Sequence, residues 1–380
     1  MADTQPILDK INKNIMDEED IARVVEVLKG GFLSKPEGGP QVVEFEKRMA
    51  AEHGKKYALA VNSGTASLHC ALTAIGLQEG DEVLVPALAN IADPTVVIQV
   101  GATPIFVDVS PDDFNIDPKQ AELKITSKTR AILVVHMYGQ PVQIEKIQKL
   151  AAEHNLILIE DCAQAAGARY NGQYVGSFGD ISCFSTYQTK HIISGEGGVV
   201  LTDNEAYVKI ISSFSHNGIK RDDLDAYDYD RLGYNYQMTE IQAVLAARQL
   251  EKLDAKNAER RKNVEHYKML LADLDITFQK GEQNTENSYF YLAGLLPESF
   301  IGKRDDFLTL VRRQSAPIKK LYPLALTELT YFKDKVEPDC VVAQNITKRI
   351  FNLYVNPGLE DDDIKFIAAA VRNAYEELSD

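Results

Sequence analysis

The sequence predicts an α/β protein in which helices cover both faces of a mostly parallel sheet and a smaller α+β region follows. Two observations predict this class. Between residues 57 and about 204, short apolar runs bounded by turn residues alternate with segments of helical period. From about residue 238, this alternation gives way to long helical patterns. Strands that are apolar on both faces and separated by amphipathic helices form parallel sheets buried between two helical layers.

Seven apolar runs are the expected strands of this sheet: YALAV (57–61), EVLVPA (82–87), TPIFVDV (103–109), AILVVHMYG (131–139), LILIED (156–161), ISCFSTY (181–187) and GVVLTD (198–203). Helical segments lie between several of them, such as TASLHCALTAIG (65–76) and QIEKIQKLAAEH (143–154). We therefore expect a three-layer αβα domain with a mostly parallel seven-stranded sheet. In sheets of this kind, ligands bind beyond the carboxyl ends of the strands.

The last third of the chain predicts a smaller domain. A long helix is expected from about residue 238, bent near Asp254, where charged residues interrupt its apolar face. The strand candidates ITFQK (276–280) and SYFYLAGLL (288–296) follow, and a C-terminal helix is expected within residues 362–378. We place the domain boundary near residue 250. Residues 1–250 are the expected large domain, with an N-terminal arm over residues 1–30, and residues 251–380 are the expected small α+β domain.

Charge and cysteine content restrict the class of partner and the compartment. The chain has 41 basic and 56 acidic side chains. This excess of acid argues against nucleic acid as a partner, because phosphate backbones bind basic surfaces. A small anionic substrate is still compatible, since a few donors in a cleft can outweigh the global charge. The four cysteines form no CxxC pair and indicate reduced thiols in the cytoplasm. No apolar run reaches the roughly 18 residues of a membrane span, so no membrane partner is expected.

The first motif that bears on chemistry is NSGTAS (62–67), which follows the strand YALAV and opens a helical pattern. Backbone amides and hydroxyls at the positive end of a helix can hold a phosphate group. Ser63 or Thr65 could equally be a plain N-cap of that helix, because both residue types are favoured there. Both interpretations stay open from this motif alone.

The second motif is IEDCAQA (159–165), at the end of an apolar strand. Glu160 and Asp161 lie at the carboxyl end of that strand. A buried carboxylate is costly unless it faces a positive partner. One such partner is the protonated ring nitrogen of pyridoxal phosphate, which needs an acidic residue to remain an electron sink. The alternative is an acid that reaches water beyond the strand end.

The third motif is CFSTYQTKHIISGEGG (183–198), where Lys190 lies five residues after Ser185. A lysine that forms a Schiff base needs a nucleophilic amine, so its pKa must be lowered by burial or by a nearby positive charge. Ser185 could give a hydroxyl to the phosphate of the same cofactor. The alternative is a surface lysine beside a glycine-rich turn. A phosphate cradle, a strand-end aspartate and a strand-end lysine, in that order, favour a cofactor site over three unrelated features.

With these motifs in place, the sequence resembles the DegT-type sugar aminotransferases, pyridoxal-phosphate enzymes of the aspartate aminotransferase superfamily with fold type I. The resemblance runs from about GFLSKPEGGPQVVEFE (31–46) to the end of the chain and is strongest over residues 57–250. It rests on VNSGTASLHCAL, GDEVLVPA, GATPIFVDV, VHMYGQP, IEDCAQAAGARYNGQYVGSFGDISCFS, TKHIISGEGG and LGYNYQMTEIQAVLAARQLEKL.

The resemblance implies a role for each matching residue. Lys190 would form the Schiff base with pyridoxal 5'-phosphate and shuttle the proton, Asp161 would hold the ring nitrogen, and Gln164 would bond the ring hydroxyl. Asn235, in the GYNY stretch, would reach the cofactor phosphate of the neighbouring subunit, which implies a homodimer with shared active sites. The residues implied to hold the phosphate within one subunit are Gly64, Thr65, Ala66 and Ser185.

The sequence departs from the family pattern at three places. The family usually has an aromatic residue over the cofactor ring, four positions after the proline of the VPA segment, and here that position is Asn90. Either the ring loses a stacking partner, worth about 1 kcal/mol, or Leu88 or Ile91 covers it instead. Gln237 replaces the arginine of the common GYNYRM motif, and the segment LYPLALTEL (321–329) lacks the family's histidine.

The implied reaction is transamination. An amino group would pass from L-glutamate or L-glutamine, through pyridoxamine phosphate, to the keto group of a nucleotide-linked keto-deoxysugar, for the biosynthesis of amino sugars and their polysaccharides, glycans or antibiotics. The diphosphate of such a substrate needs basic donors, although each candidate could also be an ordinary surface cation. The candidates are Lys35, Lys220, Arg221 and Arg231.

Two other functions are weighed against transamination. Sugar dehydratases of the same family have a histidine in place of the lysine, whereas here Lys190 is present and His191 is its neighbour. A non-catalytic regulatory relative would keep the fold without turnover. The net charge of −15 and the lack of a helix-turn-helix pattern on a basic surface argue against that role.

Overall fold

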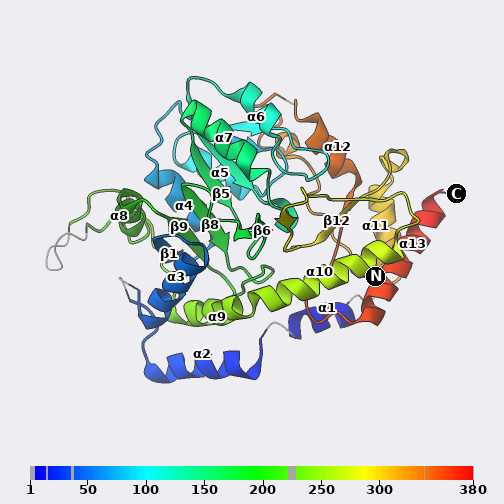
Figure 1. Ribbon diagram of the computed structural model, residues 1–380, viewed down its shortest axis with the longest axis horizontal. Helices are drawn as coiled ribbons and strands as arrows, with labels where there is room; N and C mark the ends of the chain where they lie inside the picture. The colour runs from blue at the N-terminus through cyan, green and yellow to red at the C-terminus, as the bar shows by residue number, and fades with distance from the viewer. Residues whose placement is uncertain (1–4, 14–15, 36–37, 221–227, 338, 380) are drawn as a thin grey trace.

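The computed structural model describes residues 5–13, 16–35, 38–220, 228–337 and 339–379 (Figure 1). Arg221, one of the basic candidates, lies outside these residues. The central sheet has seven strands in the order β1-β9-β8-β5-β4-β2-β3. Strands β3, β2, β4, β5 and β8 run parallel, and β9 pairs antiparallel with β8 and β1. The predicted mostly parallel seven-stranded sheet is therefore confirmed. Its strands are β1 (Tyr57–Val61), β2 (Glu82–Pro86), β3 (Thr103–Val107), β4 (Thr129–Val135), β5 (Ile157–Asp161), β8 (Ile181–Ser185) and β9 (Gly198–Thr202).

Helices cover both faces of this sheet (Figure 1). Successive residues of a strand point to opposite faces, and the packing follows this alternation. In β2, Val83 and Val85 belong to the core that contains residues of α4, α5 and α8, whereas Leu84 belongs to the core that contains residues of α6 and α7. Helices α3 and α9 cover the end of the sheet formed by β1, β9 and β8. These helices are α3 (Pro40–Glu52), α4 (Gly64–Ala74), α5 (Ala92–Gln99), α6 (Pro118–Lys124), α7 (Ile144–His154), α8 (Glu205–Phe214) and α9 (Glu240–Glu251).

The run AILVVHMYG is longer than the strand it contains. Strand β4 ends at Val135, and the next residues form a 3-10 turn, η1 (Met137–Gly139), in which Tyr138 has a φ of 56°. Met137 and Tyr138 are both fully buried. Their apolar character therefore reflects packing beyond the strand end rather than further strand.

The C-terminal part has α+β structure, as predicted. A three-stranded antiparallel sheet has the order β10-β12-β13. The long helix expected from about residue 238 is broken at Lys252, between α9 and α10, two residues before Asp254. The elements are α10 (Leu253–Leu270), β10 (Thr277–Phe278), β12 (Leu292–Leu295), η2 (Glu298–Phe300), α11 (Arg304–Arg313), η3 (Leu326–Glu328), α12 (Val341–Arg349), β13 (Ile350–Leu353) and α13 (Asp361–Ser379). A small third sheet joins β6 (Arg169–Tyr170), β7 (Gln173–Tyr174) and β11 (Thr285–Glu286).

The first helix of the chain packs against the C-terminal part. Ile7 and Ile11 of α1 (Gln5–Lys13) lie in the same apolar core as residues of α10, α11 and α13. The Nζ of Lys10 lies 2.9 Å from Oδ1 of Asp363, at the start of α13. The first and last helices therefore contact each other (Figure 1). The predicted domain boundary near residue 250 stays a prediction, because buried residues of β12 also pack in the core of the large sheet.

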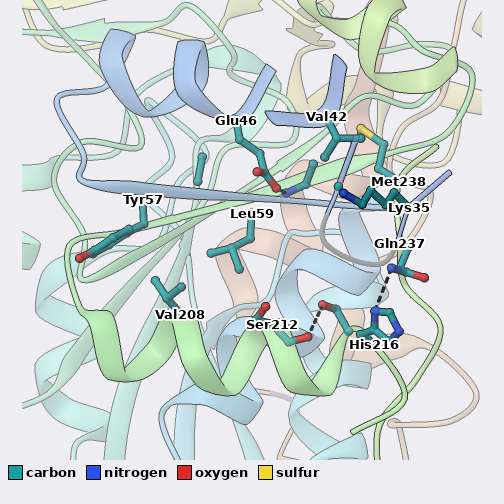
Figure 2. A pocket seen from close by; sticks show the side chains of 14 residues that line it. Lys35, Val42, Glu46, Tyr57, Leu59, Val208, Ser212, His216, Gln237 and Met238 are labelled. Carbon is teal, nitrogen blue, oxygen red and sulfur yellow. Dashed lines mark hydrogen bonds between the residues drawn. The ribbon is translucent and has the colours of Figure 1, made fainter. Parts of the chain in front are cut away.

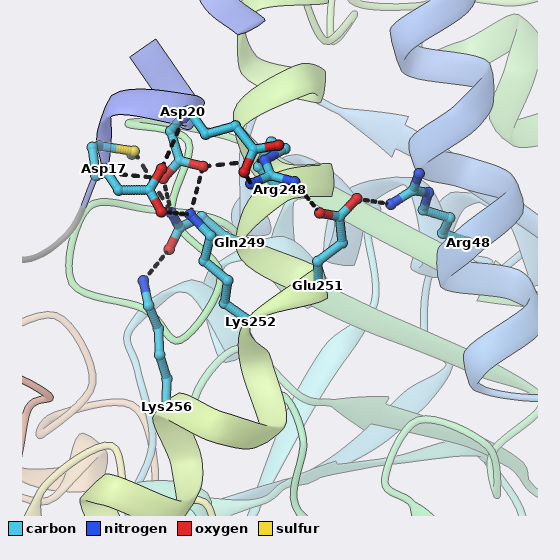
Figure 3. Close-up of polar contacts among 10 residues, drawn as sticks. Asp17, Asp20, Arg48, Arg248, Gln249, Glu251, Lys252 and Lys256 are labelled. Atoms are coloured by element: carbon cyan, nitrogen blue, oxygen red, sulfur yellow. Dashed lines mark hydrogen bonds and ion pairs between the residues drawn. The ribbon is translucent and has the colours of Figure 1, made fainter. Parts of the chain in front are cut away.

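The second helix, α2 (Glu18–Gly30), is held on α9 by a polar cluster (Figure 3). The carboxylate of Asp20 is 1% exposed and accepts hydrogen bonds from Lys252 Nζ at 2.7 Å and from Gln249 Nε2 at 3.2 Å. Arg248 Nε lies 3.3 Å from the same carboxylate.

None of the helices in the described ranges combines the length and apolar character needed to cross a membrane.

Candidate active site

A cavity of about 320 Å³ opens at the carboxyl ends of the parallel strands, where ligands of such sheets bind. Four segments of the large sheet line it: the turn that opens α4, the residues that follow β2, the end of β5 with the residues after it, and the end of β8 with the residues after it. The C-terminal part contributes aromatic side chains, Phe290, Tyr291 and Tyr322. The cavity therefore lies between the sheet and the C-terminal part, and it contains the three motifs singled out from the sequence.

Lys190 lines this cavity in the loop after β8. Its Nζ lies 4.5 Å from the centre of the Phe290 ring. Burial lowers the pKa of the Lys190 amine, and the carboxylates of Asp161 and Asp93 oppose this shift. A lowered pKa makes more of the neutral amine available, which is the form that attacks a carbonyl carbon. The structure thus places Lys190 in a cavity and not on the open surface.

Asp161 is the last residue of β5 and lines the cavity. It is 4% exposed, and its Oδ1 accepts the N–H of Ala163 at 2.8 Å. Burial raises the pKa of Asp161, while the Ala163 amide and the charge of Lys190 lower it. Lys190 is therefore a positive partner for this carboxylate within the cavity.

Glu160, the neighbouring acid, is held by hydrogen bonds away from the cavity. Because successive strand residues alternate, Glu160 points away from the cavity and accepts the N–H groups of Gly176, Phe178 and Gly179 at 2.6–2.9 Å. His136 Nε2 donates to Glu160 at 3.0 Å, and His136 Nδ1 accepts the N–H of Val142 at 3.1 Å. Burial alone would raise the pKa of Glu160, but these donors lower it. His136, Glu160 and Cys162 lie together with metal-ligand spacing. However, both ring nitrogens of His136 are already engaged.

The turn that opens α4 combines both interpretations of the NSGTAS motif. Ser63 is the N-cap, and its Oγ accepts the N–H of Ala66 at 3.1 Å. Gly64 and Thr65 line the cavity at the positive end of the helix, together with Ser185. A Cβ on Gly64 would lie 2.7 Å from the Cβ of Ser185, so only glycine lets β8 approach this turn so closely. Ala66 is buried and its amide is occupied by Ser63, so it does not line the cavity.

Gln164 lines the cavity with a fixed amide orientation. Its Oε1 accepts the N–H of Tyr138 at 3.1 Å, and its Nε2 donates to the hydroxyl of Tyr322 at 3.0 Å. Because a backbone N–H can only donate, the Oε1 must face Tyr138 and the Nε2 must face the cavity. A second hydrogen on Nε2 is therefore available for an acceptor on a bound cofactor.

Asn90 lines the cavity at the position where the resemblance leads one to expect an aromatic residue. Its Oδ1 accepts the N–H of Ala92 at 2.9 Å, and its side chain is within hydrogen-bonding reach of the Tyr322 hydroxyl. The suggestion that Leu88 or Ile91 covers the ring is not supported. Leu88 is fully buried in the core, Ile91 is 45% exposed, and neither lines the cavity. The aromatic rings present come from the C-terminal part and from Tyr187.

Several predicted residues lie outside the cavity. Asn235 is exposed, and its backbone carbonyl accepts Asn62 Nδ2 at 3.1 Å. Of the basic candidates among the described residues, Lys35, Lys220 and Arg231 do not line it. Arg231 pairs with its neighbour Asp230 at 2.9 Å.

A second pocket, of about 230 Å³, lies over β1 between α3 and α8 (Figure 2). Gln237, which replaces the family's arginine, lines this pocket, and its Nε2 lies 3.0 Å from Nδ1 of His216. Glu46 Oε1 accepts the N–H of Ala60 at 2.8 Å in the same pocket. The Gln237 replacement therefore lies away from the cofactor cavity.

The residues in the cavity fit pyridoxal phosphate. Gly64 lets the N-terminus of α4 approach Ser185 more closely than a Cβ would allow, both residues line the cavity, and Lys190 presents a buried amine beside Asp161. Sequence reasoning missed Phe290, Tyr291 and Tyr322, which come from a region more than a hundred residues further along the chain. Phe290 and Tyr291 lie in the predicted strand SYFYLAGLL (288–296) and Tyr322 in LYPLALTEL (321–329), but neither stretch by itself indicates a cavity.

Comparisons with known proteins agree with this geometry. The sequence model of the DegT/DnrJ/EryC1/StrS aminotransferase family matches residues 14–372. GDP-perosamine synthase of Caulobacter vibrioides is 42% identical over 361 residues, which cover 94% of this chain and 95% of that protein. UDP-N-acetyl-3-dehydro-alpha-D-glucosamine 3-aminotransferase of Acidithiobacillus ferrooxidans is 33% identical over 335 residues, 88% of each chain. The crystal structure of S. venezuelae DesV, in complex with a ketimine intermediate, superimposes with a TM-score of 0.87 at 29% identity over 94% of each chain.

Proposed function

The chain belongs to the DegT/DnrJ/EryC1/StrS aminotransferase family, and on this premise we propose that it moves an amino group from L-glutamate or L-glutamine to the keto group of a nucleotide-linked keto-deoxysugar. It is a pyridoxal-phosphate-dependent aminotransferase with the fold of that group of enzymes. The relatives named for GDP-linked and UDP-linked sugars support a nucleotide sugar as the substrate class. The choice of sugar, nucleotide and amino donor belongs to the proposal.

The observation that carries the proposal is the position of Lys190, whose amine lies in a cavity beside Asp161 and the cradle of α4. When bound, pyridoxal phosphate supplies an aldehyde that amines can reach and a ring that takes up electrons. We assign Lys190 to bind that aldehyde and, once its amine is released, to take and return the α-proton of the amino donor. The lowered pKa of Lys190 suits both tasks, because each requires the neutral amine.

The other cavity residues bind and orient the cofactor in this assignment. Asp161 holds the proton of the ring nitrogen, and Gln164 Nε2 donates to the ring hydroxyl. The first turn of α4, with Gly64 and Thr65, holds the phosphate together with Ser185. Asn90 lies at the position usually taken by a stacking aromatic, so aromatic cover would have to come from the C-terminal part.

The homodimer is also part of the proposal. Asn235 is exposed and lies outside the cavity of its own chain, so it is free to reach the site of a second copy. Lys35, Lys220 and Arg231 remain candidate donors for the substrate diphosphate, although they do not line the cofactor cavity. We expect the enzyme to work in the cytoplasm, because its four cysteines are all free and buried.

The dehydratase alternative places a histidine where this chain has Lys190. His191 is 2% exposed, and its Nε2 bonds the carbonyl oxygen of Ser288 at 3.1 Å, away from the cavity. Burial lowers the pKa of His191 well below its ordinary value. The lysine and not the histidine therefore faces the cofactor cavity, which favours transamination.

The test is the visible absorption spectrum of the protein with pyridoxal phosphate, before and after L-glutamate. We expect a visible band that requires Lys190 and bleaches with glutamate, because the amino group leaves the donor for the cofactor. Lys190→Ala should lack the band. Lys149→Ala, whose side chain is 75% exposed on α7, is the matched control and should behave as wild type.

A band that persists in full after both L-glutamate and L-glutamine would contradict the proposed donor. A wild-type band in Lys190→Ala would contradict the assignment of the lysine. Product analysis with GDP-linked and UDP-linked keto sugars then identifies the acceptor.

A further inference from the structure

Asp93 is a buried acid next to the cofactor cavity with no role in the assignment above. It lies in the first turn of α5, three residues after Asn90, and is fully buried. Among the described residues, neither oxygen of its carboxylate makes a well-formed hydrogen bond, and the donor near it is a backbone group of Asn90. An ionised carboxylate left in this state is strongly unfavourable. The carboxyl of Asp93 must therefore either be protonated or interact with a group on the cavity side.

The group within hydrogen-bonding reach of Asp93 is the carboxyl of Asp161. Two ionised carboxylates repel each other, so their contact is favourable only when the pair holds one proton. Asp161 is supported as the charged member by the N–H of Ala163 at 2.8 Å and by the nearby amine of Lys190. For Asp93 the backbone of Asn90 and the charge of Lys190 give less support, and burial together with the charge of Asp161 raises its pKa well above the ordinary range.

We propose that Asp93 is a positioning residue of the cofactor site, which keeps the proton of the pair and donates a hydrogen bond to Asp161. This bond holds the Asp161 carboxylate in its charged form and points its other oxygen toward the ring nitrogen of pyridoxal phosphate. Asp93 does not line the cavity, so it acts through Asp161 alone. The inference rests on the proposed role of Asp161.

The first test is the affinity of the apoprotein for pyridoxal phosphate, measured by equilibrium dialysis or cofactor fluorescence. Asp93→Ala removes the donor and should weaken binding about 10- to 100-fold, the range expected for a lost hydrogen bond to a charged group. Asp93→Asn keeps an N–H donor of the same shape and should bind within about threefold of wild type. This rescue by the conservative variant separates a donor role from a general effect on packing.

Asp113→Asn is the matched control. Asp113 is also a buried acid, with its pKa raised by burial to about 6, but it bonds Asn115 and Gln143 outside the cavity. Its replacement should leave cofactor affinity unchanged. Wild-type affinity in Asp93→Ala, or an equal loss in Asp93→Asn and Asp93→Ala, would overturn the proposal.

The second test is the stability of the apoprotein as a function of pH, which does not depend on catalysis. A carboxyl whose folded pKa lies above its unfolded value binds more protons in the folded state. Its protonated form therefore stabilises the fold at low pH, and that contribution is lost as pH rises from about 4. Asp93→Asn has no carboxyl to ionise, so it does not lose stability in this way as the pH rises. Its unfolding temperature should therefore exceed that of wild type by about 2 °C or more at pH 8 and by less at pH 5.

Other titratable groups face the pair from each neighbouring element, so the comparison is made between Asp93→Asn and wild type at each pH. These groups are Lys190 after β8, Cys183 in β8, Tyr322 from the C-terminal part and, behind Asp161, His136. If the difference in unfolding temperature between Asp93→Asn and wild type were the same at every pH, the proposal that the pair shares one proton would be wrong. If instead the pH signature is present but Asp161→Ala binds the cofactor as wild type does, the role proposed for Asp161 fails, and the positioning role of Asp93 fails with it.

Discussion

At the scale of single residues, Gly64 shows how one missing Cβ positions a phosphate site. A Cβ there would lie 2.7 Å from Ser185 Cβ, closer than real Cβ contacts. Gly64→Ala should therefore separate the first turn of α4 from β8 and weaken binding of pyridoxal phosphate at least tenfold. Fluorescence titration of the apoprotein measures this change.

Gly30→Ala is the control for that substitution, because a Cβ at Gly30 meets no atom within 4 Å. It should leave cofactor binding unchanged. Wild-type affinity in Gly64→Ala would show that the turn can move apart without loss, and the cradle would then not depend on the close approach.

Asp161 is the residue whose charge bears most directly on the reaction. Asp161→Ala leaves the ring nitrogen without its acidic partner, so the rate of transamination should fall by about 10²–10³, the range for loss of one electrostatic contact in an active site. Steady-state kinetics measure the rate, and circular dichroism should report an intact fold. Unchanged turnover would remove the electron-sink role from this residue.

Several cavity residues could be predicted from the sequence. Asp161, Ser185 and Lys190 lie at or just after the ends of apolar strands that were visible in the pattern, whereas Gln164 was implied only by the family resemblance. Asp93 was missed because acidic residues are common in the first turn of a helix, where the helix dipole favours them. Only its burial against Asp161 distinguishes it, and burial of one side chain by another element is a property of the fold.

At the scale of elements, strands were predicted more reliably than their ends. The sheet strands are apolar on both faces, which the sequence shows directly, but the end of β4 depends on where Met137 and Tyr138 find space in the core. The break between α9 and α10 was expected near Asp254 and occurs at Lys252. The aromatic side chains of the C-terminal part reach the cavity by tertiary packing alone, so no local sequence pattern could predict that they line it.

The attachment of α2 to α9 gives a prediction at this scale. Asp20 is 1% exposed and faces Arg248, Gln249 and Lys252, so Asp20→Ala removes the buried acceptor of this cluster. Arg248 keeps Glu19 and Glu251 as partners, and Lys252 keeps Asp17. Loss of hydrogen bonds to a charged group costs about 1.5–3 kcal/mol. We expect α2 to exchange its amide hydrogens faster and to become sensitive to protease.

Glu26→Ala is the comparison for this element. Glu26 pairs with Arg23 on the exposed side of the same helix at 2.8 Å, and such pairs contribute at most about 0.5 kcal/mol. Equal protection of α2 in both variants would mean that apolar contacts, and not the Asp20 cluster shown in Figure 3, hold the helix.

At the scale of the whole molecule, the proposed dimer makes cofactor binding depend on protein concentration. Asn235 is exposed and does not line the cavity of its own chain. Asn235→Ala should therefore weaken retention of pyridoxal phosphate only at concentrations where dimers form. Sedimentation with parallel dialysis measures both quantities, and tight cofactor binding by a monomer would contradict the shared site.

The contact between α1 and α13 has a consequence for how the protein is made. Lys10 and its partner Asp363 are separated by 353 positions along the chain. At translation rates of about 5–20 residues per second, α1 leaves the ribosome on the order of 20–70 s before α13 exists. During that interval Ile7 and Ile11 have no C-terminal core to cover them, because the helices against which α1 packs have not yet been made. Chaperones that bind exposed apolar segments would therefore have time to bind α1 before its core is complete.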